Sequence, residues 1–386
     1  MKKYFALIML FVFVFSLSSS TSVYAINEEM INRLNEIEEE QAMKMYEFSK
    51  MYEGKKNDEG IQKSFGGMYF EEDTLIINVV RNNEKDFQQE LGLDIEYNIV
   101  SVNYSIQELE DLKIEFEKDI SNLKLSAQHI DVKNNKLYVA TELTKYEFIE
   151  KIGKDINVDM FEIETKTTQP IYKVKYTVNG YNYTLDGEGC TVGFAARNSS
   201  GDPGFVSAGH CAEGTYVGKN VYYDSYHAGD VDDWHFEDGD VDAVFVELRD
   251  PWIGTTWLPT RSLVFGGLYD YIGTFSSYYT VGQLVRFYGR YNDDGLTNTS
   301  VEYGYVTVSD QNIYDGYTKI YDNMFATDHV THFGDSGGPA VVRIYVGEGF
   351  YEYNVIGVLS FEHPNTHDNY FSKAYEILDH LNLTAY

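Results

Sequence analysis

A histidine, an aspartate and a serine stand in three short segments whose residue types could together perform nucleophilic chemistry. His210 precedes a cysteine, Asp242 precedes an apolar run, and Ser336 lies in Gly-Asp-Ser-Gly-Gly-Pro. A serine hydroxyl is a poor nucleophile until an imidazole accepts its proton, and that imidazole needs a carboxylate to fix its tautomer and stabilise its cation. The sequence therefore predicts acyl transfer through Ser336, with His210 as base, Asp242 as its partner and no cofactor.

The glycines around Ser336 predict a tight turn that aims backbone N–H groups at one point. We expect the N–H groups of Gly334 and Ser336 to bind an oxyanion there. Each segment alone also has a plain structural interpretation, since Gly-Asp-Ser-Gly is an ordinary turn and a lone histidine is usually structural. That interpretation is poor for the three segments together.

The identity of the acid has a close competitor. Asp240 and Asp242 are two residues apart, so along a strand they share one face and differ by about 7 Å in position. Only one of them can meet the imidazole.

The same stretch also suggests calcium binding. Asp238, Asp240 and Asp242 alternate as in an EF-hand loop. That loop would need glycine for Ala243 and glutamate for Arg249, so we expect no metal in the site. A looser calcium site, or a solvated acidic loop, remains open for Asp230, Asp232 and Asp233.

Length, charge and the N-terminus narrow the class of protein. The 386 residues exceed one ordinary domain of roughly 100 to 200 residues. Lys plus Arg number 30 and Asp plus Glu 61, and the net charge of −31 excludes a nucleic-acid partner. Residues 1–25 have the basic start, short apolar core and small-residue end of a signal peptide, too short to span a bilayer. We expect cleavage after Ala25 and a secreted, extracellular protein.

The remaining chain changes character near residue 165. Residues 26–165 combine helical periodicity with two strand–turn–strand patterns, Tyr69–Val80 and Ile130–Ala140, which predicts a compact α+β region. Capping boxes open its predicted helices at Ser105, through Leu123, and at Thr144, through Ile156. Residues 166–386 hold short runs rich in Tyr, Val, Phe and Thr between turn residues, which predicts an all-β barrel or sandwich with a final helix over Ser372–Leu383.

The His, Asp and Ser segments, in this order, resemble the chymotrypsin-like serine peptidases, and more narrowly the secreted bacterial streptogrisin and α-lytic protease branch. The resemblance implies a double β-barrel with a C-terminal helix for residues 166–386. It also implies that residues 26–165 are a propeptide that assists folding and inhibits the enzyme, removed by a cut between Glu162 and Lys175. The family's acid stands just before an apolar strand, which favours Asp242.

Other residues take their expected roles from the same resemblance. Cys190 and Cys211, the only cysteines, match a disulfide of the bacterial branch. Asp335 would be buried and need a partner, for which Arg286 or Arg290 could serve. His329 and His332 are near Ser336 in sequence but are better interpreted as loop residues.

Substrate preference is the least determined property. Aligned with the family, Ser360, Phe361 and Glu362 belong to the substrate-binding strand. Leu359 stands where glutamate-selective relatives carry histidine, which counts against acidic substrates. Two alternatives stay open: Glu362 favours Lys or Arg near the cleaved bond, or it faces solvent and an apolar pocket selects large hydrophobic residues.

The resulting hypothesis is a secreted, monomeric serine endopeptidase that is made as a preproenzyme and acts on proteins or peptides. One alternative is a catalytically inactive homologue that only binds proteins. Another is a metal-dependent hydrolase, which would retain activity after Ser336→Ala.

Overall fold

The computed structural model describes most of the chain beyond the predicted signal peptide. No helix in the described part is both long and apolar enough to cross a membrane. The predicted segment 1–25 and its cleavage site lie outside that part. The described residues are 29–153, 156–165, 172–173, 183–185, 188–223, 226–237, 241–249, 262–265, 268–271, 279–289, 301–331, 335–362 and 368–385.

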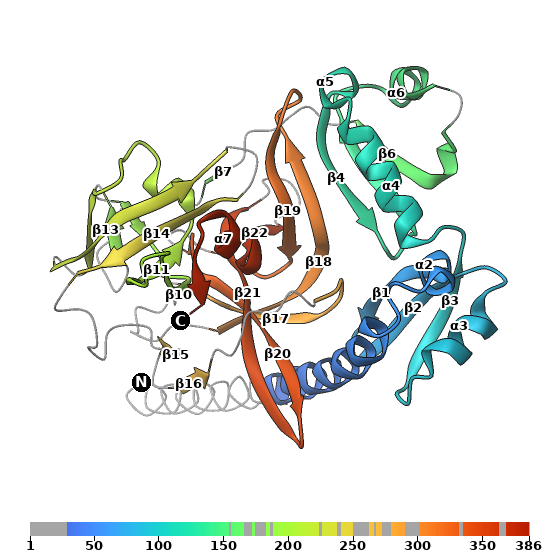
Figure 1. The fold of residues 1–386 in the computed structure, drawn as a ribbon, viewed down its shortest axis with the longest axis horizontal. Helices are drawn as coiled ribbons and strands as arrows, with labels where there is room; N and C mark the ends of the chain where they lie inside the picture. The colour runs from blue at the N-terminus through green and yellow to red at the C-terminus, as the bar shows by residue number, and fades with distance from the viewer. Residues whose placement is uncertain are drawn as a thin grey trace, which may run out of the picture.

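Two similar α+β units form the N-terminal region (Figure 1). In each unit an antiparallel hairpin is followed by a helix and a third strand parallel to the second. The first unit contains an N-terminal helix (residues 29–53), α2 (Glu59–Ser64), β1 (Phe65–Glu71), β2 (Thr74–Val80), α3 (Glu84–Leu91) and β3 (Tyr97–Val102). The second contains α4 (Ile106–Glu117), α5 (Ile120–Leu123), β4 (Leu125–Asp131), β5 (Lys136–Thr141), α6 (Lys145–Ile152), η1 (Val158–Met160) and β6 (Phe161–Thr165).

The predicted capping boxes are confirmed, but the helices that follow them are shorter than expected. Ser105 and Glu108 cap α4, and Thr144 with Glu147 caps α6. The stretch predicted through Leu123 is broken after Glu117, and a separate short helix, α5, begins at Ile120. Gly153 ends α6 with a φ of 83°, a conformation that favours glycine.

The C-terminal half is built from two curled antiparallel sheets, as expected for a double β-barrel. In the first sheet the order is β23-β10-β11-β14-β13-β12-β8-β9. Its strands are β8 (Tyr183–Leu185), β9 (Glu188–Cys190), β10 (Phe194–Arg197), β11 (Pro203–Ser207), β12 (Asn220–Tyr223), β13 (Tyr226–His235), β14 (Ala243–Leu248) and β23 (Thr384–Ala385), with the short helix η2 (Gly209–Ala212) after β11.

The second sheet closes on itself. Its strands pair in the order β17-β20-β21-β22-β19-β18, and β17 also pairs with β18, which makes a six-stranded ring. They are β17 (Leu284–Tyr288), β18 (Val301–Tyr314), β19 (Lys319–Thr327), β20 (Pro339–Gly347), β21 (Phe350–Glu362) and β22 (Asn369–Lys373). Outside the ring, β7 (Tyr172–Lys173) pairs with β21, and β15 (Ser262–Phe265) pairs with β16 (Leu268–Tyr271).

Strand β14 contributes side chains to two hydrophobic cores. Because side chains alternate across a strand, Ala243 and Phe245 join the core between the barrels, whereas Val244 and Val246 join the core of the first barrel. Helix α7 (Ala374–His380) covers the core between the barrels through Ile377. It begins two residues later than predicted, because Ser372 and Lys373 still pair with β21 as part of β22.

The two halves of the chain are joined by main-chain pairing. The far end of β18 extends beyond the ring and pairs with β4, so the ring and the sheet β4-β5-β6 form one continuous sheet. Figure 1 shows this hairpin of β18 and β19 lying beside β4.

Candidate active site

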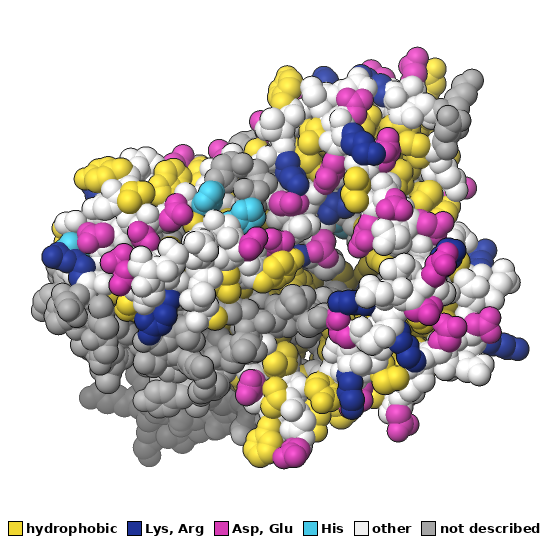
Figure 2. Space-filling view, in the orientation of Figure 1, with side chains coloured by type: hydrophobic (Ala, Val, Ile, Leu, Met, Phe, Trp, Pro, Cys, Tyr) yellow, Lys and Arg dark blue, Asp and Glu magenta, His cyan; other side chains and the backbone are white. Residues whose placement is uncertain are grey.

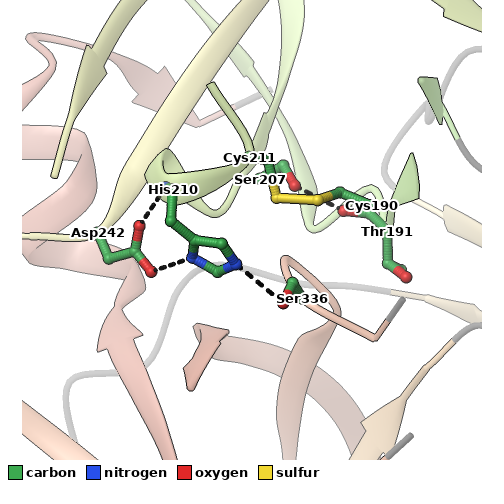
Figure 3. Close-up of a disulfide and its surroundings, with 7 residues drawn as sticks. All are labelled: Cys190, Thr191, Ser207, His210, Cys211, Asp242 and Ser336. Carbon is green, nitrogen blue, oxygen red and sulfur yellow. Dashed lines mark hydrogen bonds and ion pairs between the residues drawn. A yellow bond between two sulfur atoms is a disulfide. The ribbon is translucent and has the colours of Figure 1, made fainter. Parts of the chain in front are cut away.

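His210, Asp242 and Ser336 come together between the two barrels, from segments far apart in sequence (Figure 3). The imidazole Nδ1 lies 2.8 Å from Oδ2 of Asp242, and Nε2 lies 3.0 Å from Oγ of Ser336. The backbone N–H of His210 also donates to Oδ1 of Asp242 at 2.7 Å. All three side chains are at most 1% exposed. The arrangement provides a path for a proton from the hydroxyl to the imidazole, with a carboxylate on the opposite ring nitrogen.

Local sequence explains how each residue reaches its place. Gly209 packs so closely on β13 that a Cβ there would lie 1.9 Å from the carbonyl oxygen of His235. This close approach sets η2, and therefore His210, against the start of β14. Gly337 has a φ of 85°, and a Cβ on it would lie 2.0 Å from Oγ of Ser207. Only glycine fits these two positions without displacing a neighbour.

Backbone hydrogen bonds hold the turn around Ser336. The N–H of Thr191 donates to the carbonyl of Ser336, and the N–H of Gly337 donates to that of Leu359, both at 2.8 Å. Asp335 is buried next to this turn and lies against Gly289. Four residues named in the sequence analysis lie outside the described residues. They are Gly334, expected to bind the oxyanion; Asp240, the competing acid; Arg290, the alternative partner of Asp335; and His332.

The predicted disulfide is present and joins Cys190 to Cys211. It links the end of β9 to η2, one residue beyond His210. The chain between the two cysteines is closed into a loop, so the histidine is fixed covalently on one side and by Asp242 on the other. A link of this kind restricts the unfolded chain more than the folded one.

Ser372 is a buried residue of the site that the sequence did not single out. Its Oγ accepts a hydrogen bond from the backbone N–H of Asp242 at 2.9 Å and lies 3.1 Å from Oγ of Ser360. Both serines are at most 2% exposed. A serine at the end of a strand carries no motif, and only the pairing of β21 with β22 places it behind Asp242.

The three residues predicted on the substrate strand occupy the end of β21. Ser360 is buried against Ser372, and the ring of Phe361 lies between those of Tyr370 and Tyr321, at 5.0 and 5.6 Å. Glu362 is half-buried, and its backbone pairs with Asn369 on one side and with Tyr172 of β7 on the other.

His329 is buried and contacts Phe287, with 4.4 Å between ring centroids. Burial lowers the pKa of its imidazole to about 3, because the charged form loses its hydration. His329 is therefore neutral near neutral pH. Within the described residues its Nε2 has no hydrogen-bond partner.

The aspartates named for a looser calcium site or a solvated acidic loop contact other protein groups. Asp230 contacts His227, Asp232 accepts from Asn198, and Asp233 accepts from its neighbour Trp234. No group of three or more potential ligands is placed to hold a metal ion in the part of the chain that the structure describes.

Two curled β-sheets with a buried Ser-His-Asp constellation between them define the chymotrypsin-like class of serine peptidases. The family model named Trypsin matches residues 177–379, more than half of the 386 residues. The chain therefore belongs to the trypsin family and is a serine endopeptidase.

Several solved structures are similar to about half of the chain. Nocardiopsis protease is 26% identical over 54% of this chain and 97% of its own, with a TM-score of 0.38. Cellulomonas bogoriensis chymotrypsin is 22% identical over 54% and 98%, with a TM-score of 0.38. A glutamic acid-specific serine protease that uses a histidine triad in substrate binding is 23% identical over 54% and 100%, with a TM-score of 0.40. No curated protein matches the chain.

Proposed function

We propose that the protein is a secreted serine endopeptidase that cleaves protein or peptide substrates through an acyl-enzyme on Ser336. The observation that carries this proposal is the continuous set of contacts from Asp242 through His210 to Oγ of Ser336. A serine so placed has a base within hydrogen-bond distance, and that base has an orienting carboxylate.

The reaction follows from these contacts. His210 accepts the hydroxyl proton as Oγ of Ser336 bonds to the substrate carbonyl carbon, and the N–H groups of Gly334 and Ser336 stabilise the oxyanion. The imidazolium then gives its proton to the leaving amine as the C–N bond breaks. A water molecule then attacks the ester carbon while His210 accepts its proton. The ester bond breaks, the imidazolium returns the proton to Oγ of Ser336, and the acid product leaves. Asp242 orients the imidazole through Nδ1 and stabilises the imidazolium.

Labelling with a fluorophosphonate separates an enzyme from an inactive homologue. Such a probe reacts only with a serine whose proton a base can accept, so we expect labelling of the matured protein confined to Ser336. Mass spectrometry of the labelled peptides identifies the site. Folded protein that stays unlabelled would make the inactive homologue the better interpretation. A chelator should leave the labelling unchanged, whereas a metal-dependent hydrolase would lose its activity.

Ser372 acts in this proposal as a positioning residue for Asp242. Replacing it with alanine leaves the buried N–H of Asp242 unpaired, and a small displacement of the acid should lower kcat/KM by about 10-fold. Because Asp242 stabilises an imidazolium that forms only during the reaction, the loss should fall on kcat, with KM nearly unchanged. Ser372→Thr, which keeps the hydroxyl, should restore kcat. An unchanged kcat in Ser372→Ala would remove Ser372 from this role.

We propose further that residues 1–25 are a signal peptide and that residues 26–165 are a propeptide, removed after export. Two contacts support the second point. Strand β4 of the N-terminal region extends the sheet of the catalytic half, where Oη of Tyr314 accepts from Gln128 at 2.7 Å and donates to Glu117 at 3.0 Å. Strand β7, between the two regions in sequence, pairs with β21 at Phe361 and Glu362, the strand expected to bind substrate.

The register of β7 on β21 predicts which bond is cut. The pairs Tyr172–Glu362 and Lys173–Phe361 are antiparallel, so β7 runs along β21 in the direction of Ser360. Leu359 is hydrogen-bonded to Gly337, beside the nucleophile. We therefore expect the first cut within one residue of Val174, at Lys173–Val174 or Val174–Lys175. N-terminal sequencing of the secreted protein measures this, and a mature end upstream of residue 170 would contradict it.

The backbone of Ser360–Glu362 is proposed to bind substrates as it binds β7. Selectivity for the cleaved residue then depends on whether Glu362 faces the bound chain. The two alternatives remain a preference for Lys or Arg, selected by the carboxylate, and a preference for large hydrophobic residues.

A further inference from the structure

The N-terminal helix, residues 29–53, is held against the catalytic half by a buried carboxylate. Glu38 is 2% exposed, and its oxygens accept from Nε and Nη2 of Arg286 on β17 at 3.0 and 2.8 Å. Tyr353 of β21 donates to the same carboxylate at 3.3 Å. Next to it, Arg343 of β20 contacts Glu39 at 2.8 Å. A bidentate guanidinium–carboxylate pair has strict geometry as well as strength.

A second contact lies one helical turn further along. The side-chain amide of Gln41 accepts from the N–H of Leu284 at 2.7 Å and donates to the carbonyl of Gly282 at 3.0 Å. Gln41 is buried, and these two partners are backbone groups just before and at the start of β17; its amide also donates to the carbonyl of Glu72 in the N-terminal region at 2.6 Å. Glu38 and Gln41 are three residues apart and so face the same side of the helix. The surface therefore recognises a helix with Glu-x-x-Gln spacing.

The groups that bind Glu38 are oriented by their own half of the protein. The guanidinium of Arg286 lies 4.3 Å from the ring centroid of Tyr353, and that of Arg343 lies 4.3 Å from the ring centroid of Tyr351. These four residues, here termed the arginine–tyrosine site, belong to strands β17, β20 and β21. These ring contacts come from the catalytic half itself, and side chains already held by such contacts bind with less loss of side-chain freedom.

Apolar surface continues the site toward the tip of the β20–β21 hairpin. Figure 1 shows this hairpin crossing the N-terminal helix, and Tyr345 packs on Tyr46 of the helix with 5.3 Å between ring centroids. Hydrophobic side chains gather over the end of the hairpin (Figure 2), where Phe350 is 66% exposed. The charged side chains of Arg286 and Arg343 therefore lie beside an apolar surface, and such a combination is complementary to an amphipathic helix.

We infer that, once residues 26–165 are removed, the arginine–tyrosine site is an exosite that docks an acidic amphipathic helix of a protein substrate. The inference rests on the proposed maturation. It goes beyond that maturation by assigning a substrate feature recognised away from the cleaved bond. Arg343 stands seven residues after Ser336, and β20 rises about 3.4 Å per residue, so docking occurs up to about 24 Å from the nucleophile.

The test compares one fluorogenic peptide, cleaved by the enzyme matured from the full chain, with the same peptide joined to residues 29–53. A Gly-Ser linker of about 16 residues has an r.m.s. span of roughly 20–24 Å, which matches the separation. The linked peptide should show a KM lower by at least about 10-fold, with kcat unchanged, because docking raises the effective concentration of the cleavable segment.

Variants of the attached helix make the test specific while the enzyme stays unaltered. Glu38→Gln and Gln41→Ala should each remove most of the gain. Glu36→Gln, which makes the same charge change at an exposed residue paired with Arg33, should retain it. An equal loss in Glu36→Gln and Glu38→Gln would show general charge attraction and overturn the inference, as would an unchanged KM.

Fluorescence anisotropy of a labelled 29–53 peptide measures docking without hydrolysis. Binding to a matured protein that hydrolyses nothing would contradict the proposed enzyme and leave the exosite intact. Hydrolysis of the short peptide without binding of the helix would contradict the exosite alone.

Discussion

Replacing Ser336 with alanine in the matured protein is expected to reduce peptide hydrolysis by on the order of 10⁴- to 10⁶-fold. The variant has no atom that can bond to the substrate carbonyl. His210→Ala should cost a similar factor, because the hydroxyl loses the base that lies 3.0 Å from it. The double variant should be no slower than either single variant, since the two side chains act as one unit. Initial rates on a fluorogenic peptide, corrected for folded protein by circular dichroism, measure all three.

A surface histidine supplies the control for these variants. His227 contacts Asp230 on the first sheet and takes no part in the site, so His227→Gln should hydrolyse the peptide at the rate of the unaltered protein. The rate of hydrolysis by Asp242→Asn should lie between the rates of His227→Gln and Ser336→Ala, because an amide holds the imidazole in the wrong tautomer. Substantial hydrolysis by Ser336→Ala would mean that another group attacks the substrate and would end the acyl-enzyme proposal.

Residues 166–386 expressed alone should yield little active enzyme, and adding residues 26–165 as a separate chain should restore part of it. Both sheets of the catalytic half pair strands distant in sequence, and such topologies fold slowly. The N-terminal region presents β4 as a template for β18 and satisfies buried polar groups of that hairpin, including Asn312, which donates to Glu117. Recovered activity after dilution from denaturant measures the assistance.

Two variants of the added segment show whether the contacts seen in the structure are responsible. Gln128→Ala removes the hydrogen bond to Tyr314 and should assist less than the unaltered segment. Lys63→Ala affects an exposed residue that pairs with Glu59 and should assist equally well. Refolding of the isolated catalytic half to full activity at the same rate would contradict a folding role for residues 26–165.

The sequence predicted best where a few adjacent residues carry the information. The functional residues His210 and Ser336 each lie in a short motif of adjacent residues. The capping boxes at Ser105 and Thr144 depend on pairs of residues only three positions apart. Long-range relations were not predictable in this way. The pairing of β4 with β18 and the contact of Glu38 with Arg286 join residues that only tertiary structure brings together.

Competition between local and tertiary preferences explains the remaining differences. The apolar spacing near the C-terminus fits a helix from Ser372, but hydrogen bonding to β21 keeps Ser372 and Lys373 in strand β22. The same pairing places the hydroxyl of Ser372 behind Asp242. Helix periodicity could not reveal this role, since it assigned the residue to a different element.

The extension of β18 beyond the closed ring has a consequence for solubility. While β4 is present, the backbone groups near Asn312 and Ile313 are paired on that side. If residues 26–165 are removed as proposed, this stretch would become a bare strand edge, which could pair with the same edge of another copy and start aggregation. Such pairing depends on concentration, so maturation in a dilute medium would favour the monomer, whereas maturation in a crowded compartment would favour aggregates.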